Sequence, residues 1–182
     1  MITVVAIPIG DVKDALSALG AVSPQISFQI GPAIDPPEEG YSRMRRQYQG
    51  RAFLDAIRGF SGHRVIGLTD ADMYEGDLNF IFGLAEINGR VCVVSTARLR
   101  HPSITIFHER VKKEVLHELG HTFGLHHCKS SRCVMRFSNT LAEVDAKGVS
   151  FCPDCLTIWN NAIRLVSSEP QVSFKLGDRL DL

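Results

Sequence analysis

The segment from His117 to His127 reads His-Glu-Leu-Gly-His-Thr-Phe-Gly-Leu-His-His, and it constrains this chain more than any other stretch. On an α-helix, His117 and His121 lie about one turn apart on the same face, so their imidazoles can bind one metal ion. Glu118 can then reach a water molecule on that metal. Gly124 can end the helix in a left-handed conformation, which lets His127 return as a third ligand. Three protein ligands leave a position for water, as in catalytic zinc sites.

The apolar pattern around this motif predicts a helix with one buried face. Apolar residues recur at helical spacing between residues 107 and 123, with the histidines and Glu114 on the opposite side. The buried set is Val111, Val115, Leu116, Leu119 and Phe123. Two alternatives stay open: the histidines can be solvated residues of a surface helix, and His126 competes with His127 as the third ligand. The three-residue step after Gly124 favours His127.

The cysteines indicate a second metal site. Cys92 lies in an apolar run and is expected to be a small buried hydrophobic residue. The other four form a C-x4-C pair, Cys128 and Cys133, and a C-x2-C pair, Cys152 and Cys155. This spacing predicts a structural zinc site with four thiolate ligands. Two disulfides are the alternative, and they need an oxidising compartment. The chain opens without a secretory leader, which favours zinc and a cytoplasmic location.

These motifs together resemble the archaemetzincin branch of the metzincin zinc peptidases. The resemblance rests on the eleven-residue motif, on Met135 placed two residues after Cys133, and on the cysteine pair at 152 and 155. It implies a zincin architecture in which Met135 forms the Met-turn below the metal.

The resemblance also assigns roles to the motif residues. It implies that His117, His121 and His127 bind a catalytic zinc ion and that Glu118 is the general base. It makes the four cysteines the ligands of a structural zinc ion. We therefore expect two Zn²⁺ ions per chain.

The charge balance excludes several partner classes. The 182 residues carry 20 basic and 20 acidic side chains, so the net charge is zero, which argues against nucleic-acid or membrane-surface binding. No apolar run approaches the roughly twenty residues that a helix needs to cross a bilayer. We expect one monomeric domain over residues 1–182. Its subdomains would be residues 1–125, with the sheet and the motif helix, and residues 126–182, with the cysteine site and a C-terminal helix.

The order of apolar patterns predicts the fold class. Strands are expected at 2–9, 25–30, 65–68, 78–85 and 90–95, the last two forming a hairpin around Asn88-Gly89. Helices are expected at 11–19, 42–57, 107–123 and 152–165. This order predicts an α+β fold with a mixed, mainly parallel sheet that packs on helices. Residues 167–182 suit either a strand around Val172, Phe174 and Leu176 or a loose tail.

The expected function is hydrolysis of peptide bonds by a zinc-activated water molecule, with Glu118 as general base. By resemblance, an edge strand pairs with the extended peptide substrate. The candidate substrate-binding residues are Asn79, Phe80, Ile81, Phe82 and Gly83. The alternative is that this segment is only a strand of the sheet.

Two other function classes remain open. One is a zinc-binding protein on the same scaffold with little or no peptidase activity, its cleft blocked for example by residues 167–182. The other is a binding module in which the four cysteines form a nucleic-acid knuckle. Zero net charge and only three nearby cations, Lys129, Arg132 and Arg136, argue against the second class.

Overall fold

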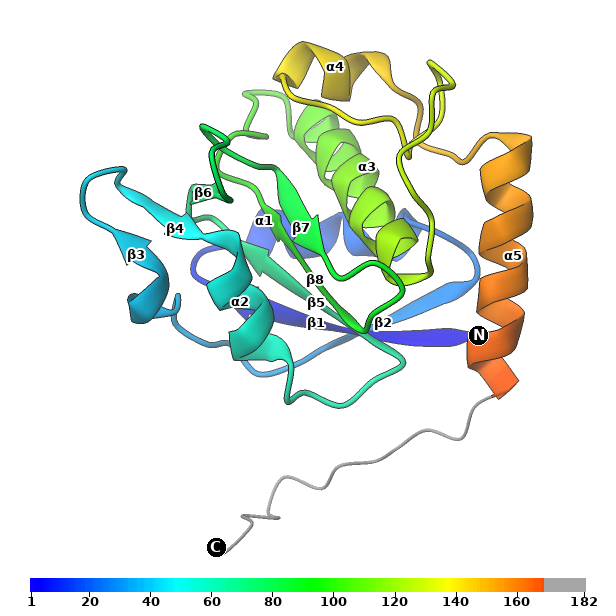
Figure 1. Cartoon of the computed structure of the whole chain (residues 1–182), viewed down its shortest axis with the longest axis horizontal. Coiled ribbons are helices and arrows are strands. Elements are labelled where there is room, and N and C mark those ends of the chain that lie inside the picture. Colours follow the sequence, from blue (N-terminus) through cyan, green and yellow to red (C-terminus); the bar gives the residue numbers. More distant parts are fainter. Residues whose placement is uncertain (169–182) are drawn as a thin grey trace, which may run out of the picture.

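The computed structural model describes residues 1–168 and is built around a five-stranded sheet (Figure 1). The strand order is β2-β1-β5-β8-β7, with bounds Ile26–Ile30, Ile2–Ile9, Arg64–Thr69, Val91–Ser95 and Gly83–Ala85. The strands from β2 to β8 are parallel, and β7 pairs antiparallel with β8 at one edge. The expected mainly parallel sheet with an edge hairpin is confirmed. β5 and β8 are buried along their whole length, which explains why their sequences are mostly continuous runs of apolar residues.

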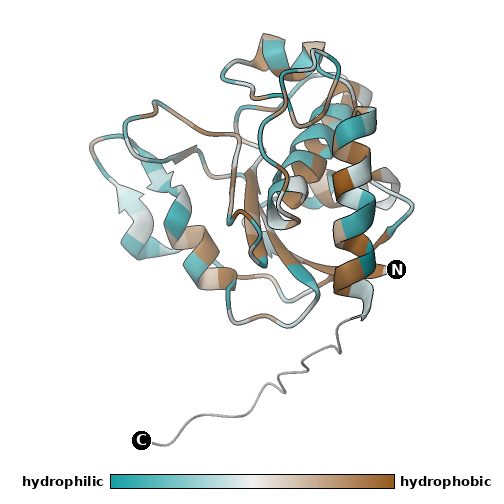
Figure 2. Ribbon diagram, turned by 45° about the vertical axis from the view of Figure 1, so that its right-hand side comes forward, coloured by the Kyte–Doolittle hydropathy of each residue, from teal (hydrophilic) through white to brown (hydrophobic). Residues whose placement is uncertain are grey.

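Helices cover both faces of the sheet. α1 (Lys13–Ser17) and α3 (Ile104–Thr122) pack on one face, and α2 (Gly50–Ile57) covers the other. Alternate residues of β1 point to opposite faces, so Val4 joins the core under α3 and Ile7 joins the core under α2. α5 (Pro153–Ser168) adds Trp159 to the α3 side. Figure 2 shows brown, hydrophobic residues along the strands of the sheet and mixed teal and brown residues along the helices.

A second, smaller sheet replaces part of an expected helix. The helix expected over 42–57 is wrong in its first half, where β3 (Tyr41–Ser42) and β4 (Gln47–Gln49) form a hairpin and α2 begins only at Gly50. β4 also pairs in parallel with β6 (Met73–Tyr74). Pairing of Tyr48 with Met73 is a long-range contact that helical periodicity cannot reveal. The helix expected at 11–19 is likewise only α1, followed by a 3-10 turn at Leu19–Ala21.

The motif helix ends where the sequence predicts. Gly124 has φ +85, the left-handed conformation that glycine adopts without strain. The Gly124 amide donates to the His121 carbonyl at 2.9 Å, and the Leu125 amide donates to the Gly120 carbonyl at 3.0 Å. This pair of bonds is a Schellman motif, and it turns the chain back towards the helix.

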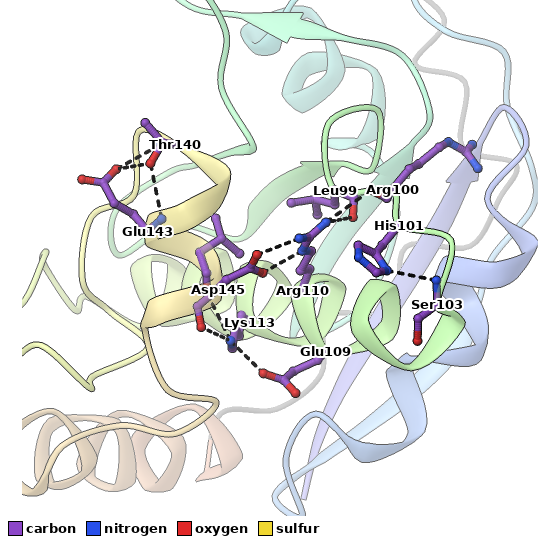
Figure 3. Close-up of polar contacts among 11 residues, drawn as sticks. Leu99, Arg100, His101, Ser103, Glu109, Arg110, Lys113, Thr140, Glu143 and Asp145 are labelled. Atoms are coloured by element: carbon purple, nitrogen blue, oxygen red, sulfur yellow. Dashed lines mark hydrogen bonds and ion pairs between the residues drawn. The ribbon is translucent and has the colours of Figure 1, made fainter.

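One helix was not expected from the sequence. α4 (Leu141–Ala146) begins with a capping box, in which the Glu143 amide donates to Thr140 Oγ1 at 3.3 Å and the Thr140 amide donates to the Glu143 carboxylate at 2.9 Å. Its C-terminal end is tied to α3, where Arg110 and Lys113 reach Asp145 and its neighbours (Figure 3). The Thr-x-x-Glu spacing was the available signal.

The chain end lies outside the described part. The strand or loose tail considered for 167–182 falls on residues 169–182, apart from Ser167 and Ser168, which complete α5. Among the helices of residues 1–168, none combines the length and the hydrophobicity that crossing a membrane requires.

Candidate active site and metal centre

Three histidines converge at the C-terminal end of α3. His117 and His121 lie on successive turns of the helix, and His127 returns after the turn at Gly124. One nitrogen from each of these three side chains lies within 4.8 Å of the other two. We call them the histidine cluster. His126 lies outside this group, although it lines the cavity beside it.

Main-chain carbonyl groups orient the two helical imidazoles. His117 Nδ1 lies 2.9 Å from the Val134 oxygen, and His121 Nδ1 lies 2.7 Å from the Leu125 oxygen. A carbonyl oxygen only accepts, so both Nδ1 atoms carry a proton and both Nε2 atoms present lone pairs. These Nε2 atoms are 3.2 Å apart. Two facing lone pairs repel each other unless a cation lies beside both of them.

Burial favours the uncharged imidazoles that metal binding requires. The pKa of His121 is lowered to about 4, mainly because burial penalises the charged ring. Burial also lowers the pKa of His117 well below its ordinary value and, to a lesser degree, that of His127. A shared proton is therefore a poor bridge between the Nε2 atoms. The donor set fits a divalent metal ion such as zinc.

Glu118 is buried next to the histidine cluster and packs against strand β7. A Cβ atom added to Gly83 would lie 2.5 Å from Glu118 Oε1 and 2.7 Å from its Cδ. The carboxylate therefore rests directly on the glycine backbone. Burial, reinforced by the nearby charge of Glu114, raises the pKa of Glu118 well above its ordinary value.

The four cysteines form a second cluster, and none of them is in a disulfide. The sulfur atoms of Cys128, Cys133, Cys152 and Cys155 all lie within 4.8 Å of one another, and those of Cys128 and Cys152 are 3.7 Å apart. A disulfide needs about 2.05 Å. Four sulfurs at about 2.3 Å from one zinc ion are roughly 3.8 Å apart at the edges of a tetrahedron. The cysteine cluster therefore fits a zinc ion and does not fit two disulfides.

The environment of the cysteine cluster lowers one thiol pKa and raises others. The Cys152 amide donates to Cys133 Sγ at 3.3 Å, and the Ser130 amide donates to Cys128 Sγ at 3.4 Å. The Cys155 amide lowers the pKa of Cys152, whereas burial raises the pKa of Cys133 and Cys155. Backbone donors of this kind stabilise thiolates.

The two clusters share one short loop. Cys128 directly follows His127, and its amide donates to the Met135 carbonyl at 2.9 Å. The Met135 side chain is buried under α3, where a Cβ on Gly120 would lie 2.4 Å from its sulfur. Gly120 was not singled out from the sequence, although it lies inside the motif. Its missing side chain is what admits Met135.

A cavity of about 300 Å³ lies beside the histidine cluster. One wall comes from the segment before and within β7, and four of the five residues expected to bind substrate line it: Phe80, Ile81, Phe82 and Gly83. Asn79 does not line the cavity, and its carbonyl accepts a hydrogen bond from Gln47 at 2.8 Å. The strand expected at 78–85 is shorter than predicted, because only Gly83–Ala85 pair with β8. Glu114 also lines the cavity, on the helix face that the sequence predicts, whereas Phe137 was not expected there.

Comparison with known proteins agrees with this arrangement. The sequence model of peptidase family M54 matches residues 38–161, which is more than half of the chain and includes the histidine cluster and the cysteine cluster. The chain belongs to peptidase family M54. The archaemetzincin of Halobacterium salinarum is 40% identical over 164 residues, which cover 82% of this chain and 94% of that protein. The archaemetzincin of Methanopyrus kandleri is 54% identical over 121 residues, which cover 65% of this chain and 69% of that protein.

The fold comparison supports the same family. The crystal structure of the Methanopyrus kandleri archaemetzincin superposes with a TM-score of 0.85 and 38% identity, covering 90% of this chain and 96% of that one. As a member of family M54, the present chain is a zinc metallopeptidase that acts on peptide or protein substrates. The predicted resemblance, fold class and enzyme class are confirmed, and the alternative of a zinc scaffold with little activity is not favoured.

Proposed function

We propose that His117, His121 and His127 bind the catalytic zinc ion and that Glu118 is the general base of peptide hydrolysis. The observation that carries this proposal is the 3.2 Å approach of two deprotonated Nε2 atoms, each fixed by a carbonyl on the far side of its ring. His127 completes a set of three nitrogen donors, the number typical of catalytic zinc.

When bound, zinc acidifies a water molecule and polarises the scissile carbonyl. Glu118 then takes the proton from the attacking water and passes it to the leaving amine nitrogen. Burial suits this role, because a carboxyl group with a raised pKa holds the transferred proton long enough to deliver it. The contact with Gly83 holds the carboxylate at the edge of β7, close to a peptide lying along that strand.

We propose that the segment Asn79–Gly83, continued by β7, holds the extended substrate. β7 pairs with β8 along one side only, so its other side can add a peptide strand by backbone hydrogen bonds. Phe80, Ile81 and Phe82 line the cavity and give it an apolar wall. Asn79 would begin this segment outside the cavity, where its carbonyl accepts a hydrogen bond from Gln47.

We propose that Cys128, Cys133, Cys152 and Cys155 bind a second, structural zinc ion, so that the chain holds two. The support is the separation of the sulfur atoms, which suits a tetrahedral site. Met135 would form the Met-turn below the catalytic metal, supported by its burial against Gly120.

We further propose a cytoplasmic, monomeric enzyme with one domain over residues 1–182. Reduced thiols suit that compartment, and one chain supplies all the proposed site residues. Residues 1–125 would form the sheet and helix subdomain, and residues 126–182 would form the subdomain with the cysteine cluster.

The deciding experiment replaces Glu118 by alanine. The Glu118→Ala protein should retain its zinc and lose hydrolysis by about two to four orders of magnitude, the usual contribution of a general base. Elemental analysis and cleavage of a quenched-fluorescence peptide mixture measure the two properties. Wild-type turnover in this variant would exclude Glu118 as the base.

A further inference from the structure

Glu114, which lines the cavity, forms a buried ion pair with Lys147 that is not part of the proposed zinc chemistry. Glu114 precedes His117 by almost one turn of α3 and lines the cavity, although only 3% of its surface is exposed. Its Oε1 lies 2.8 Å from Lys147 Nζ, in a close ion pair. Lys147 follows α4 and is buried, and its Nζ also lies 3.5 Å from the Arg136 oxygen.

The Glu114–Lys147 pair is not needed to hold α4 against α3, because other contacts already join the two helices. Arg110 already forms a bidentate ion pair with Asp145, with both contacts at 2.7 Å. Lys113 donates to the carbonyl groups of Val144 and Asp145 at 3.1 Å. Burying two further charges carries a large desolvation penalty, and apolar residues of similar volume often serve stability equally well.

Glu114 adds a hydrogen-bond acceptor to a cavity that has several aromatic and aliphatic wall residues, apart from the histidines and Glu118 of the proposed catalytic site. No described residue donates a hydrogen bond to Glu114 Oε2, whereas Oε1 is enclosed beside Lys147. The apolar part of the cavity lining includes Phe80, Phe82 and Phe137. None of the described residues that line the cavity is lysine or arginine. A ligand that enters the cavity can therefore reach the Glu114 carboxylate as a hydrogen-bond acceptor.

The charge of Lys147 decides which donor suits this acceptor. Lys147 already neutralises the Glu114 carboxylate, and a divalent ion on the histidine cluster would offset the other two carboxylates that line the cavity, Glu75 and Glu118, so a cationic ligand gains no net attraction there. A carboxylate ligand would be repelled by Glu114. An uncharged donor, such as a hydroxyl or a primary amide, can bind Glu114 without that repulsion.

We propose that the Glu114–Lys147 pair is a specificity determinant that selects substrates with an apolar side chain ending in an uncharged hydrogen-bond donor, such as tyrosine or glutamine, next to the scissile bond. This inference rests on the proposed peptidase site and names the substrate class that it takes. Apolar walls hold the stem of the side chain, and the Glu114 carboxylate accepts the bond from its tip.

The test uses matched peptides that differ at one position, tyrosine against phenylalanine and glutamine against leucine, scanned through three residues on either side of the cleaved bond. At one position the wild-type zinc enzyme should cleave the donor-bearing member about tenfold faster in kcat/KM, the effect of one hydrogen bond to a charged group. Mass spectrometry of mixed pairs gives the ratio. Cleavage without a preference at any position overturns the inference.

Two variants separate the pair from the rest of the cavity. Glu114→Leu/Lys147→Met replaces both charges with apolar groups, and the ratio should fall to about one as the acceptor disappears. Lys147→Met alone leaves an uncompensated carboxylate, so preference should move to lysine or arginine by about tenfold over glutamine. The control Arg110→Met/Asp145→Leu removes the neighbouring ion pair and should keep the wild-type ratio.

A binding measurement distinguishes failure of this inference from failure of the proposed function. In the Glu118→Ala background, calorimetry of the same peptide pairs should show about tenfold tighter binding of the donor-bearing member. If that preference is present while the wild-type enzyme cleaves none of the peptides, the catalytic proposal fails and the specificity inference stands. If cleavage is normal and no binding preference exists, the reverse holds.

Discussion

His117 Nδ1 lies 2.9 Å from the main-chain oxygen of Val134, which lies between Cys133 and Met135 in the sequence. The contact joins the motif helix to the loop that carries the cysteine cluster. Groups that hold the far nitrogen of a metal-binding histidine fix its tautomer and direction. The two proposed metal sites are therefore linked through this loop. Disturbing the cysteine cluster should change the orientation of His117 and so weaken metal binding by the histidine cluster.

Replacing Cys152 by serine tests this link. The Cys152→Ser protein should lose the structural zinc, so that elemental analysis falls from two ions per chain to one. The remaining ion should bind about 10- to 100-fold more weakly, because the Val134 carbonyl is no longer held in place. Competition with a chromogenic chelator measures the affinity. Cys92→Ala is the matched control, since Cys92 is a buried cysteine outside the cluster, and it should keep both ions. A Cys152→Ser protein that retains two tightly bound ions would contradict the assignment.

The third ligand can be decided between neighbouring histidines. His127→Gln removes a nitrogen of the histidine cluster and should lose the catalytic zinc and all hydrolysis, whereas His126→Gln should retain both. Zinc content after dialysis against a mild chelator reads out the difference. The opposite pattern would make His126 the ligand.

We predict that the contact with Gly83 holds the Glu118 carboxylate in its catalytic position. In Gly83→Ala the new methyl group would overlap Glu118, whose Oε1, Cγ and Cδ all lie within 2.7 Å of the ideal Cβ position. Displacing a catalytic group by about 1 Å costs roughly 100-fold in rate, so kcat should fall with zinc retained. Gly59→Ala is the control, because nothing lies within 4 Å of its added Cβ. An unchanged kcat in Gly83→Ala would show that the position of Glu118 does not depend on its close contact with Gly83.

The Arg110–Asp145 pair predicts a pH-dependent contribution to stability. The hydrogen bonds from Arg110 lower the pKa of Asp145 below its ordinary value. A depressed carboxyl pKa stabilises the fold above the unfolded-state pKa of about 3.9, and this stabilisation is lost as the pH falls through the lower folded-state value. The Asp145 side chain is 45% exposed, so solvent screening limits the effect to about 1 kcal/mol.

Urea unfolding of Asp145→Asn checks this prediction. The variant should have a lower free energy of unfolding than the wild type at pH 7. The free energies of unfolding of the two proteins should converge below about pH 4. A difference that persists in acid would mean that the carboxylate charge is not what stabilises the contact.

The proposed metal sites were readable from the sequence because their spacing is local. Four-residue helical spacing and a glycine stop specify where His117 and His121 face, and the Schellman bonds at Gly124 follow from the same glycine. The buried strands were readable as apolar runs for the same reason.

The features that were missed depend on contacts across the fold or on a weaker local signal. The hairpin of β3 and β4 has Arg46 at φ 55 and gains its pairing from β6, so the apolar spacing of 42–57 was misleading. The capping box of α4 was visible in the sequence, but its docking on α3 was not. Pairing of Glu114 with Lys147 depends on that docking and could not be foreseen.

The three histidines are unequally covered, since His117 and His121 are buried and His127 is exposed. In the proposed site, two donors are prearranged by the helix and the third closes from the solvent side. Zinc would therefore be exchanged past His127, and the speed of loading would follow the motion of one surface ring rather than the opening of the protein core.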